Sequence, residues 1–75
     1  MFGGRSKLDK GLDAFEKSEW KRARKLLEDA LQDEPRPAGF YHLGLLYWRG
    51  LGGDVDKAAG VDCFERGAEF GHPGA

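Results

Sequence analysis

Apolar side chains recur along the first half of this chain at spacings of three and four positions, with charged residues between them. In residues 7–17 they form one stripe, made of Leu8, Leu12 and Phe15. In residues 18–33 a longer stripe contains Trp20, Ala23, Leu26, Leu27, Ala30 and Leu31. This spacing places the apolar side chains on one face of an α-helix, which repeats about every 3.6 residues. The pattern therefore predicts two amphipathic helices.

Residues that favour helix ends flank both segments. Ser6 and Ser18 suit the N-cap position, because a serine hydroxyl accepts a hydrogen bond from a free N–H of the first turn. Asp9 follows Ser6 by three positions, as the acid of a capping box does. Pro35 ends the second helix, since proline cannot continue the hydrogen-bond ladder.

The second half of the chain predicts a further pair of helices. Pro37 suits the first turn of the third helix, and Gly50 suits a left-handed C-cap. Either Asp54 or Asp56 caps the fourth helix, which closes at Gly71. The apolar face of the third helix contains Phe40, Leu43, Gly44 and Tyr47. That of the fourth contains Val61, Phe64 and Ala68, flanked by Cys63 and Gly67.

No stretch alternates apolar and polar residues as a half-buried strand does, and the β-branched residues are limited to Val55 and Val61. The predicted fold class is therefore all-α. A length of 75 residues is sufficient for one small domain. Charged residues make up 33% of the chain and hydrophobic residues 40%, which is typical of a globular protein and argues against disorder.

The charge pattern gives no indication of a nucleic-acid partner. The formal net charge is −1, so no global field attracts the chain to nucleic acid or anionic lipid. The basic cluster consists of Lys21, Arg22, Arg24 and Lys25. These side chains spread around the predicted helix with acidic residues beside them, and we interpret them as a solvated face.

Cysteine content and hydropathy restrict the location. With Cys63 as the one cysteine, no disulfide can form within the chain, which fits a reducing compartment. No apolar run approaches the roughly 20 residues of a membrane span, and the first residues lack the apolar core of a secretory signal. We therefore predict a cytoplasmic protein without a membrane partner.

The residues that could carry chemistry do not form a familiar site. His42, His72 and Cys63 have neither the i, i+4 nor the Cys-x-x-Cys spacing of metal ligands, so we predict no metal and no cofactor. A dyad of Cys63 with a histidine is conceivable on residue types alone. The glycine-rich residues 50–53 follow a helix, whereas a phosphate-binding loop follows a strand. The sequence therefore favours a protein that is not an enzyme, in which Cys63 is a small buried hydrophobe.

The two halves share a period in the mid-thirties, the length of a helix-turn-helix solenoid unit. In the first half, the residues at recurring spacings are Gly11, Trp20, Ala23, Leu27, Ala30 and Pro35. This half resembles a tetratricopeptide repeat. The second half resembles the Sel-one-like subclass of that family through Tyr41, Leu43, Gly44, Tyr47, Gly50, Gly52, Asp56, Phe64, Ala68, Glu69, Gly71 and His72, with Ala75 where a next unit would begin. It departs from the family pattern at Gly39, Gly60, Cys63 and Gly67.

The resemblance implies two antiparallel helix-turn-helix repeats stacked as a short right-handed α-solenoid. Residues 1–75 would form a single domain, with one repeat over about 5–36, a second over about 37–72, and the start of a further repeat or a tail at 73–75. Solenoids usually need about three or more repeats. We therefore expect apolar groups of the last helix, such as Phe64 or Phe70, to be exposed.

In tetratricopeptide proteins the first helix of each unit lines a concave groove that binds peptides. The resemblance implies that Tyr41, Leu45 and Trp48 line this groove, with Arg49 and His42 beside them; core packing is the alternative for the aromatic residues. Asp9, Asp13 and Glu16 would add an acidic side, or form a solvated face instead. These eight residues are the candidate partner-binding set.

The predicted function is a non-enzymatic module that binds a protein or peptide with apolar and some basic residues. Some family members hold a terminal carboxylate with asparagines and lysines, and the absence of asparagine from this chain argues against that function. The alternative is a structural unit that assembles with itself, as a homo-oligomer, or that caps a longer repeat protein through its exposed repeat ends.

Overall fold

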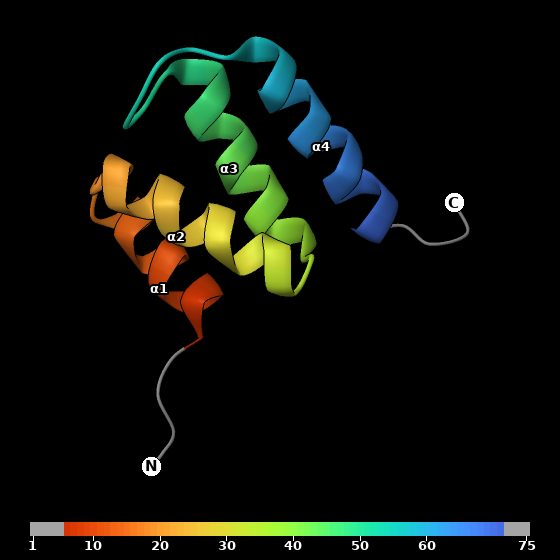
Figure 1. The fold of residues 1–75 in the computed structure, drawn as a ribbon, viewed down its shortest axis with the longest axis horizontal. Coiled ribbons are helices and arrows are strands. Elements are labelled where there is room, and N and C mark those ends of the chain that lie inside the picture. The colour runs from red at the N-terminus through yellow and green to blue at the C-terminus, as the bar shows by residue number, and fades with distance from the viewer. Residues whose placement is uncertain (1–5, 72–75) are drawn as a thin grey trace.

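The computed structural model describes residues 6–71, and these residues form four helices joined by short turns (Figure 1). The helices are α1 (Lys7–Glu16), α2 (Trp20–Asp33), α3 (Pro37–Arg49) and α4 (Lys57–Gly71). No strand occurs in this part of the chain. The prediction of an all-α fold is confirmed, and His72 and residues 73–75 lie outside the described residues.

Three of the predicted helix ends are confirmed by their hydrogen bonds or backbone angles. The hydroxyl of Ser6 accepts from the backbone N–H of Asp9 at 3.1 Å. A carboxylate oxygen of Asp56 accepts from the N–H of Ala59 at 3.0 Å, which chooses Asp56 over Asp54 as the cap of α4. Gly50 ends α3 in the left-handed region, with φ of 68°.

The prediction of Ser18 as an N-cap is wrong. Helix α2 begins at Trp20, with Glu19 at the N-cap position, and Ser18 has a positive φ of 62°. Its N–H donates to the carbonyl of Phe15 at 3.0 Å, and the N–H of Glu19 donates to the carbonyl of Ala14 at 2.9 Å. This pair of bonds is the Schellman motif that closes a helix C-terminus. Ser18 therefore completes the C-terminus of α1. It cannot be the N-cap of α2, because an N-cap residue needs the extended backbone region.

Helix α3 ends in the same motif as α1. The N–H of Gly50 donates to the carbonyl of Tyr47 at 3.3 Å, and the N–H of Leu51 donates to that of Leu46 at 2.9 Å. Glycine occupies the left-handed position here at no steric cost, whereas Ser18 carries the cost of a side chain at positive φ.

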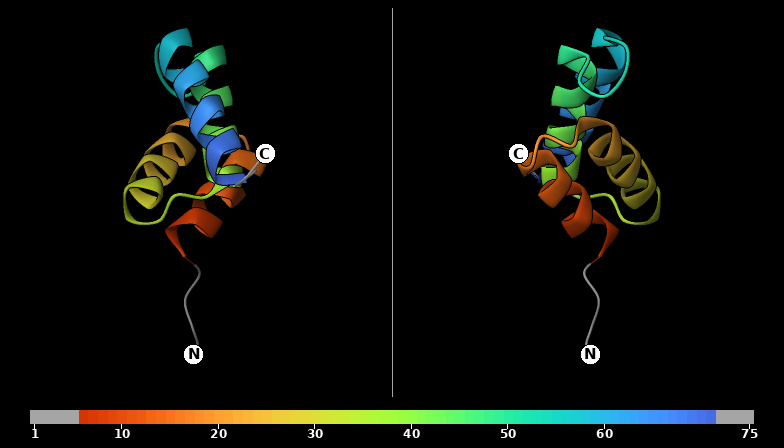
Figure 2. Two further views of the ribbon diagram at one scale, coloured as in Figure 1. Left: turned by 90° about the vertical axis from the view of Figure 1, so that its right-hand side faces the viewer. Right: turned by 90° about the vertical axis from the view of Figure 1, so that its left-hand side faces the viewer.

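Helix α3 is the centre of the fold (Figures 1 and 2). It packs against α4 and also against both helices of the first pair. Helix α4 packs on α3 alone, and none of its Cα atoms lies within 8 Å of one in α1 or α2. The structure is therefore two helical hairpins, α1–α2 and α3–α4, in contact mainly through α3. The buried core contains Ala14, Ala23, Leu27, Phe40, Leu43, Leu46 and Cys63.

Each hairpin is closed by a glycine that lets its two helices approach. A Cβ atom on Gly11 of α1 would lie 2.7 Å from a methyl carbon of Leu27 of α2. A Cβ atom on Gly44 of α3 would lie 2.6 Å from the ring of Phe64 of α4. Gly60 meets Gly44 from the opposite side, since a Cβ on Gly60 would lie 3.0 Å from the carbonyl oxygen of Gly44.

These glycine contacts explain why the predicted apolar face of α4 is partly wrong. Phe64 and Gly67 are half-buried against α3, and Gly60 and Cys63 are buried. Val61 and Ala68, which were expected to face the core, are exposed. The closest helix approach is through the glycine side of α4, so the side that carries Val61 and Ala68 turns outward.

Candidate functional site

The second hairpin has an uncovered apolar side, which we call the open face. It consists of Tyr41, Leu45 and Trp48 from α3 and Val61 and Phe64 from α4. Tyr41 is 55% exposed, Trp48 40% and Val61 41%, while Leu45 and Phe64 are half-buried. Large apolar groups exposed side by side are unusual on a monomer surface and often mark a binding site.

Contacts within the hairpin hold the aromatic side chains of this face in place. The rings of Tyr41 and Phe64 lie 6.0 Å apart between centroids. The ammonium group of Lys57 lies 5.2 Å from the centroid of the Trp48 ring, a cation–π contact. Trp48 also flanks Gly60, because a Cβ on Gly60 would lie 3.3 Å from the Cβ of Trp48. The aromatic rings of the open face therefore pack against their own hairpin.

The corresponding side of the first hairpin is covered. Leu8, Leu12 and Phe15 occupy the same positions relative to Gly11 as Tyr41, Leu45 and Trp48 occupy relative to Gly44. Helix α3 lies on these side chains. A Cβ on Gly39 would lie 2.9 Å from a methyl carbon of Leu8, and the ring of His42 meets that of Phe15 at 4.7 Å between centroids. Within residues 6–71, no helix does the same for the second hairpin.

The predicted partner-binding residues of α3 divide into two groups. Tyr41, Leu45 and Trp48 come together on the open face, and Arg49 is exposed at the end of the same helix. His42 is turned toward the first hairpin instead. Its ring lies against Phe15, and its Nδ1 atom is 2.7 Å from the carbonyl oxygen of Ala38.

The acidic candidates lie on α1, in different settings. Asp9 and Glu16 are exposed. Asp13 is half-buried, and its carboxylate lies 3.0 Å from the ammonium group of Lys17, one helical turn away. Asp13 is therefore paired within its own helix.

A further hollow lies between α2 and α4, with α3 as its floor. This inter-hairpin groove has a volume of about 560 Å³. It is lined by Glu28, Leu31, Gln32, Phe40, Leu43, Tyr47, Ala59, Asp62, Cys63 and Arg66. Its charged groups already have partners, because Asp62 pairs with Arg66 at 3.1 Å and Glu28 accepts a hydrogen bond from the Tyr47 hydroxyl.

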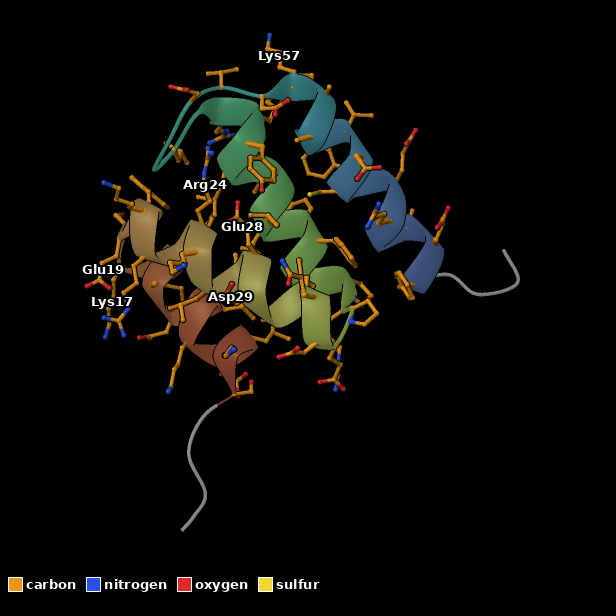
Figure 3. All side chains as sticks on the ribbon, viewed as in Figure 1. Lys17, Glu19, Arg24, Glu28, Asp29 and Lys57 are labelled. Atoms are coloured by element: carbon orange, nitrogen blue, oxygen red, sulfur yellow. The ribbon has the colours of Figure 1, made fainter. Side chains whose placement is uncertain are left out.

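Arg24 of α2 joins the two hairpins, and Figure 3 shows it and Glu28 on the side of α2 that faces α3. The guanidinium group donates to the backbone carbonyls of Leu46 at 3.1 Å, Leu51 at 3.3 Å and Asp54 at 3.1 Å. It also lies 4.7 Å from the centroid of the Tyr47 ring. Arg24 thereby fixes the end of α3 and the loop that leads to α4.

The interpretation of Arg24 as a solvated surface residue is therefore wrong, although Lys21, Arg22 and Lys25 are exposed as expected. A signal for its role was present in the sequence. Arg24 lies directly after Ala23 and three positions before Leu27, inside the apolar stripe of α2.

Burial raises the pKa of the Tyr47 hydroxyl above its ordinary value, and the hydrogen bond to Glu28 and the negative charge of that carboxylate raise it further. The positive charge of Arg24 lowers the pKa of Tyr47 in part. The folded chain thus favours the neutral phenol. This contribution to stability is complete below the ordinary tyrosine pKa of about 10 and is lost as the pH rises above it.

We accordingly expect the free energy of unfolding of the wild type to fall as the pH rises above about 10, and to fall less steeply in Tyr47→Phe, which has no hydroxyl to ionise. Urea unfolding followed by circular dichroism across this range measures both slopes. Equal slopes for wild type and Tyr47→Phe would contradict the expectation.

Cys63 lies in the core, as predicted, and is 6% exposed. Burial raises the pKa of its thiol, and the negative charge of Asp62 adds to the effect. A nucleophilic cysteine needs the opposite shift, because the thiolate is the reactive form. The environment of Cys63 therefore favours packing over a nucleophilic role.

Among the described residues, no three His, Cys, Asp or Glu side chains come together as metal ligands would. Each of the four helices is too short or too polar to cross a bilayer.

No family model matches this chain, and no curated protein or solved structure is significantly similar to it.

Proposed function

We propose that this chain is a non-enzymatic interaction module that holds an apolar helix of a partner protein against the open face. The observation that carries this proposal is that two similar helix surfaces differ in whether another helix covers them. The side of the first hairpin that contains Leu8 and Phe15 is covered by α3, whereas the matching side of the second hairpin leaves Tyr41 and Trp48 exposed.

We further propose that the two hairpins are tetratricopeptide-like repeats and that the second is of the Sel-one-like kind. Three structural features support this proposal. Each hairpin is closed by one glycine, Gly11 or Gly44, against an apolar side chain of its second helix. The first helix of each hairpin ends in a Schellman motif, at Ser18 and at Gly50. The second hairpin packs on the first mainly through α3, the first helix of its own pair.

The chemistry of the open face suits a helical partner. Tyrosine and tryptophan bury large areas while losing few rotamers, and they dominate binding energy at many interfaces. On the first hairpin, the covering helix α3 presents Gly39 where it approaches Leu8 and Leu31. By analogy, a partner helix would carry apolar and small residues on its contact side, spaced by three and four positions.

The proposal predicts that Trp48→Ala weakens binding of a partner by about 30-fold, or about 2 kcal/mol. The partner would be isolated on the tagged full chain, identified by mass spectrometry and purified, and its affinity measured by isothermal titration calorimetry. Tyr41→Ala should weaken binding in the same direction.

Val55→Ser is the matched control. Val55 is 58% exposed but lies in the loop before α4, outside the open face, so its replacement should leave the affinity unchanged. A partner that binds Trp48→Ala and Tyr41→Ala as tightly as the wild type would show that the open face is not the binding surface.

A further inference from the structure

We propose that the partner on the open face is a second copy of this chain, held in a closed, two-fold symmetric dimer in which the two α4 helices cross antiparallel at Val61. This inference rests on the proposed function, because it assigns an occupant to the same surface. It follows from the chemistry of the two ends of the molecule and from the arrangement of charge along α4.

The two ends of the stacked hairpins differ in polarity. The open face of the second hairpin is apolar. The outer side of the first hairpin has two hollows instead, and most of the residues that line them carry a charge. One is lined by Lys21, Arg22, Lys25, Leu26 and Asp29, and the other by Lys10, Asp13, Ala14, Lys17, Glu19 and Arg22. We call this side the charged end.

Head-to-tail stacking would press the open face of one copy against the charged end of the next. Lysine and arginine groups would then lose water against tyrosine and tryptophan without gaining partners for all their charges, which is costly. An isologous contact, open face against open face, covers the apolar groups of both copies and leaves both charged ends in water. Such a contact closes at two copies.

Charges on α4 are complementary under this symmetry. Lys57 lies four positions before Val61, and Glu65 lies four positions after it. All three are exposed. When two α4 helices cross antiparallel at Val61, Lys57 of each copy lies opposite Glu65 of the other, which gives two equivalent ion pairs.

Neither Lys57 nor Glu65 forms an ion pair within the described part of the chain. Lys57 contacts the ring of Trp48 and has no ion-pair partner there. Glu65 likewise has none, whereas the neighbouring Asp62 is already paired with Arg66. The two side chains are thus available for a partner that brings the reciprocal charge.

The first test is sedimentation equilibrium of the full chain from micromolar to millimolar concentration. The wild type should pass from monomer to dimer and no further. Val61→Asp should weaken the dimer at least 100-fold while keeping the wild-type circular dichroism spectrum, because Val61 is 41% exposed and its replacement opens no cavity in the core.

The second test uses the two charges. Lys57→Glu and Glu65→Lys should each weaken the dimer about 10-fold, because each places like charges opposite one another twice. An equimolar mixture of these two variants should associate as tightly as the wild type, since both ion pairs reform between unlike copies. Asp33→Lys changes an exposed acid on α2, away from the open face, and should leave the dimer unchanged.

The other outcomes each overturn a defined part of the account. A wild type that remains monomeric at millimolar concentration overturns the dimer, and the proposed function stands if a different partner depends on Trp48. Growth beyond two copies overturns the two-fold closure. A dimer that tolerates both Val61→Asp and the charge reversals is formed by another surface. Absence of both the dimer and any Trp48-dependent partner removes the proposed function as well.

Discussion

Replacing Leu27 with alanine is expected to lower the free energy of unfolding by about 2–5 kcal/mol, the range found for large-to-small changes at well-packed sites. Leu27 is fully buried and lies against Gly11 at the closest approach of α1 and α2. A chain of this size has a total stability of about 4–11 kcal/mol, so the loss is a large part of the whole. Urea unfolding followed by circular dichroism measures it.

Leu45→Ala is the matched control for Leu27→Ala. Leu45 is the same residue type on a helix of the same fold, but it lies half-buried on the open face. Its replacement should lower the free energy of unfolding by less than about 1 kcal/mol. Both leucine variants are compared in a Val61→Asp background, so that dimer formation does not contribute to the measured stability. Equal losses for the two leucines would contradict the placement of the core.

Replacing Arg24 with alanine is expected to cost about 2–3 kcal/mol, because hydrogen bonds to a charged group contribute roughly 1.5–3 kcal/mol each and water replaces part of this set. The loss should be local as well as global. The backbone amides of the loop after α3 should exchange hydrogen faster in Arg24→Ala than in the wild type, since Arg24 holds the carbonyls of Leu51 and Asp54. Arg24→Lys should recover only part of the stability, because an ammonium group cannot match the planar fork.

The control for Arg24→Ala is Lys25→Ala, which removes the neighbouring but exposed cation of the same helix. Its effect on stability should stay within about 0.5 kcal/mol, and its loop should exchange as in the wild type. A loop that is equally protected in Arg24→Ala and in the wild type would show that Arg24 does not join the hairpins.

Local signals in the sequence were sufficient to predict the four helices and three of their ends. Ser6, Asp56 and Gly50 act within one turn of their own helix, so their roles follow from neighbouring residues and are confirmed. The N-cap prediction for Ser18 was wrong because neighbouring residues alone leave its role open. It can start one helix or end another, and the backbone bonds of Glu19 and Ala14 decided for the second.

Tertiary packing decided what periodicity alone could not. The large apolar residues Val61 and Phe64 predicted the inner side of α4, but close contact between Gly44 and Gly60 rotates the helix and leaves Val61 outside. The resemblance to tetratricopeptide repeats implied that Tyr41, Leu45 and Trp48 line a binding groove, and the structure brings the three together on the open face. Arg24 was assigned to the solvent-exposed face because a hydrophobic pattern counts every charged residue as exposed. In the structure its guanidinium group donates to three backbone carbonyls between the hairpins.

The most direct test of the account is to map the contact surface by nuclear magnetic resonance, recording amide and tryptophan indole shifts as the protein concentration, or an identified partner, is increased. The account predicts that the changes concentrate on α3 and α4 around Trp48 and Val61 and spare the charged end. Shifts centred on the charged end around Lys17 and Arg22, or in the groove around Glu28, with Trp48 unmoved, would contradict it.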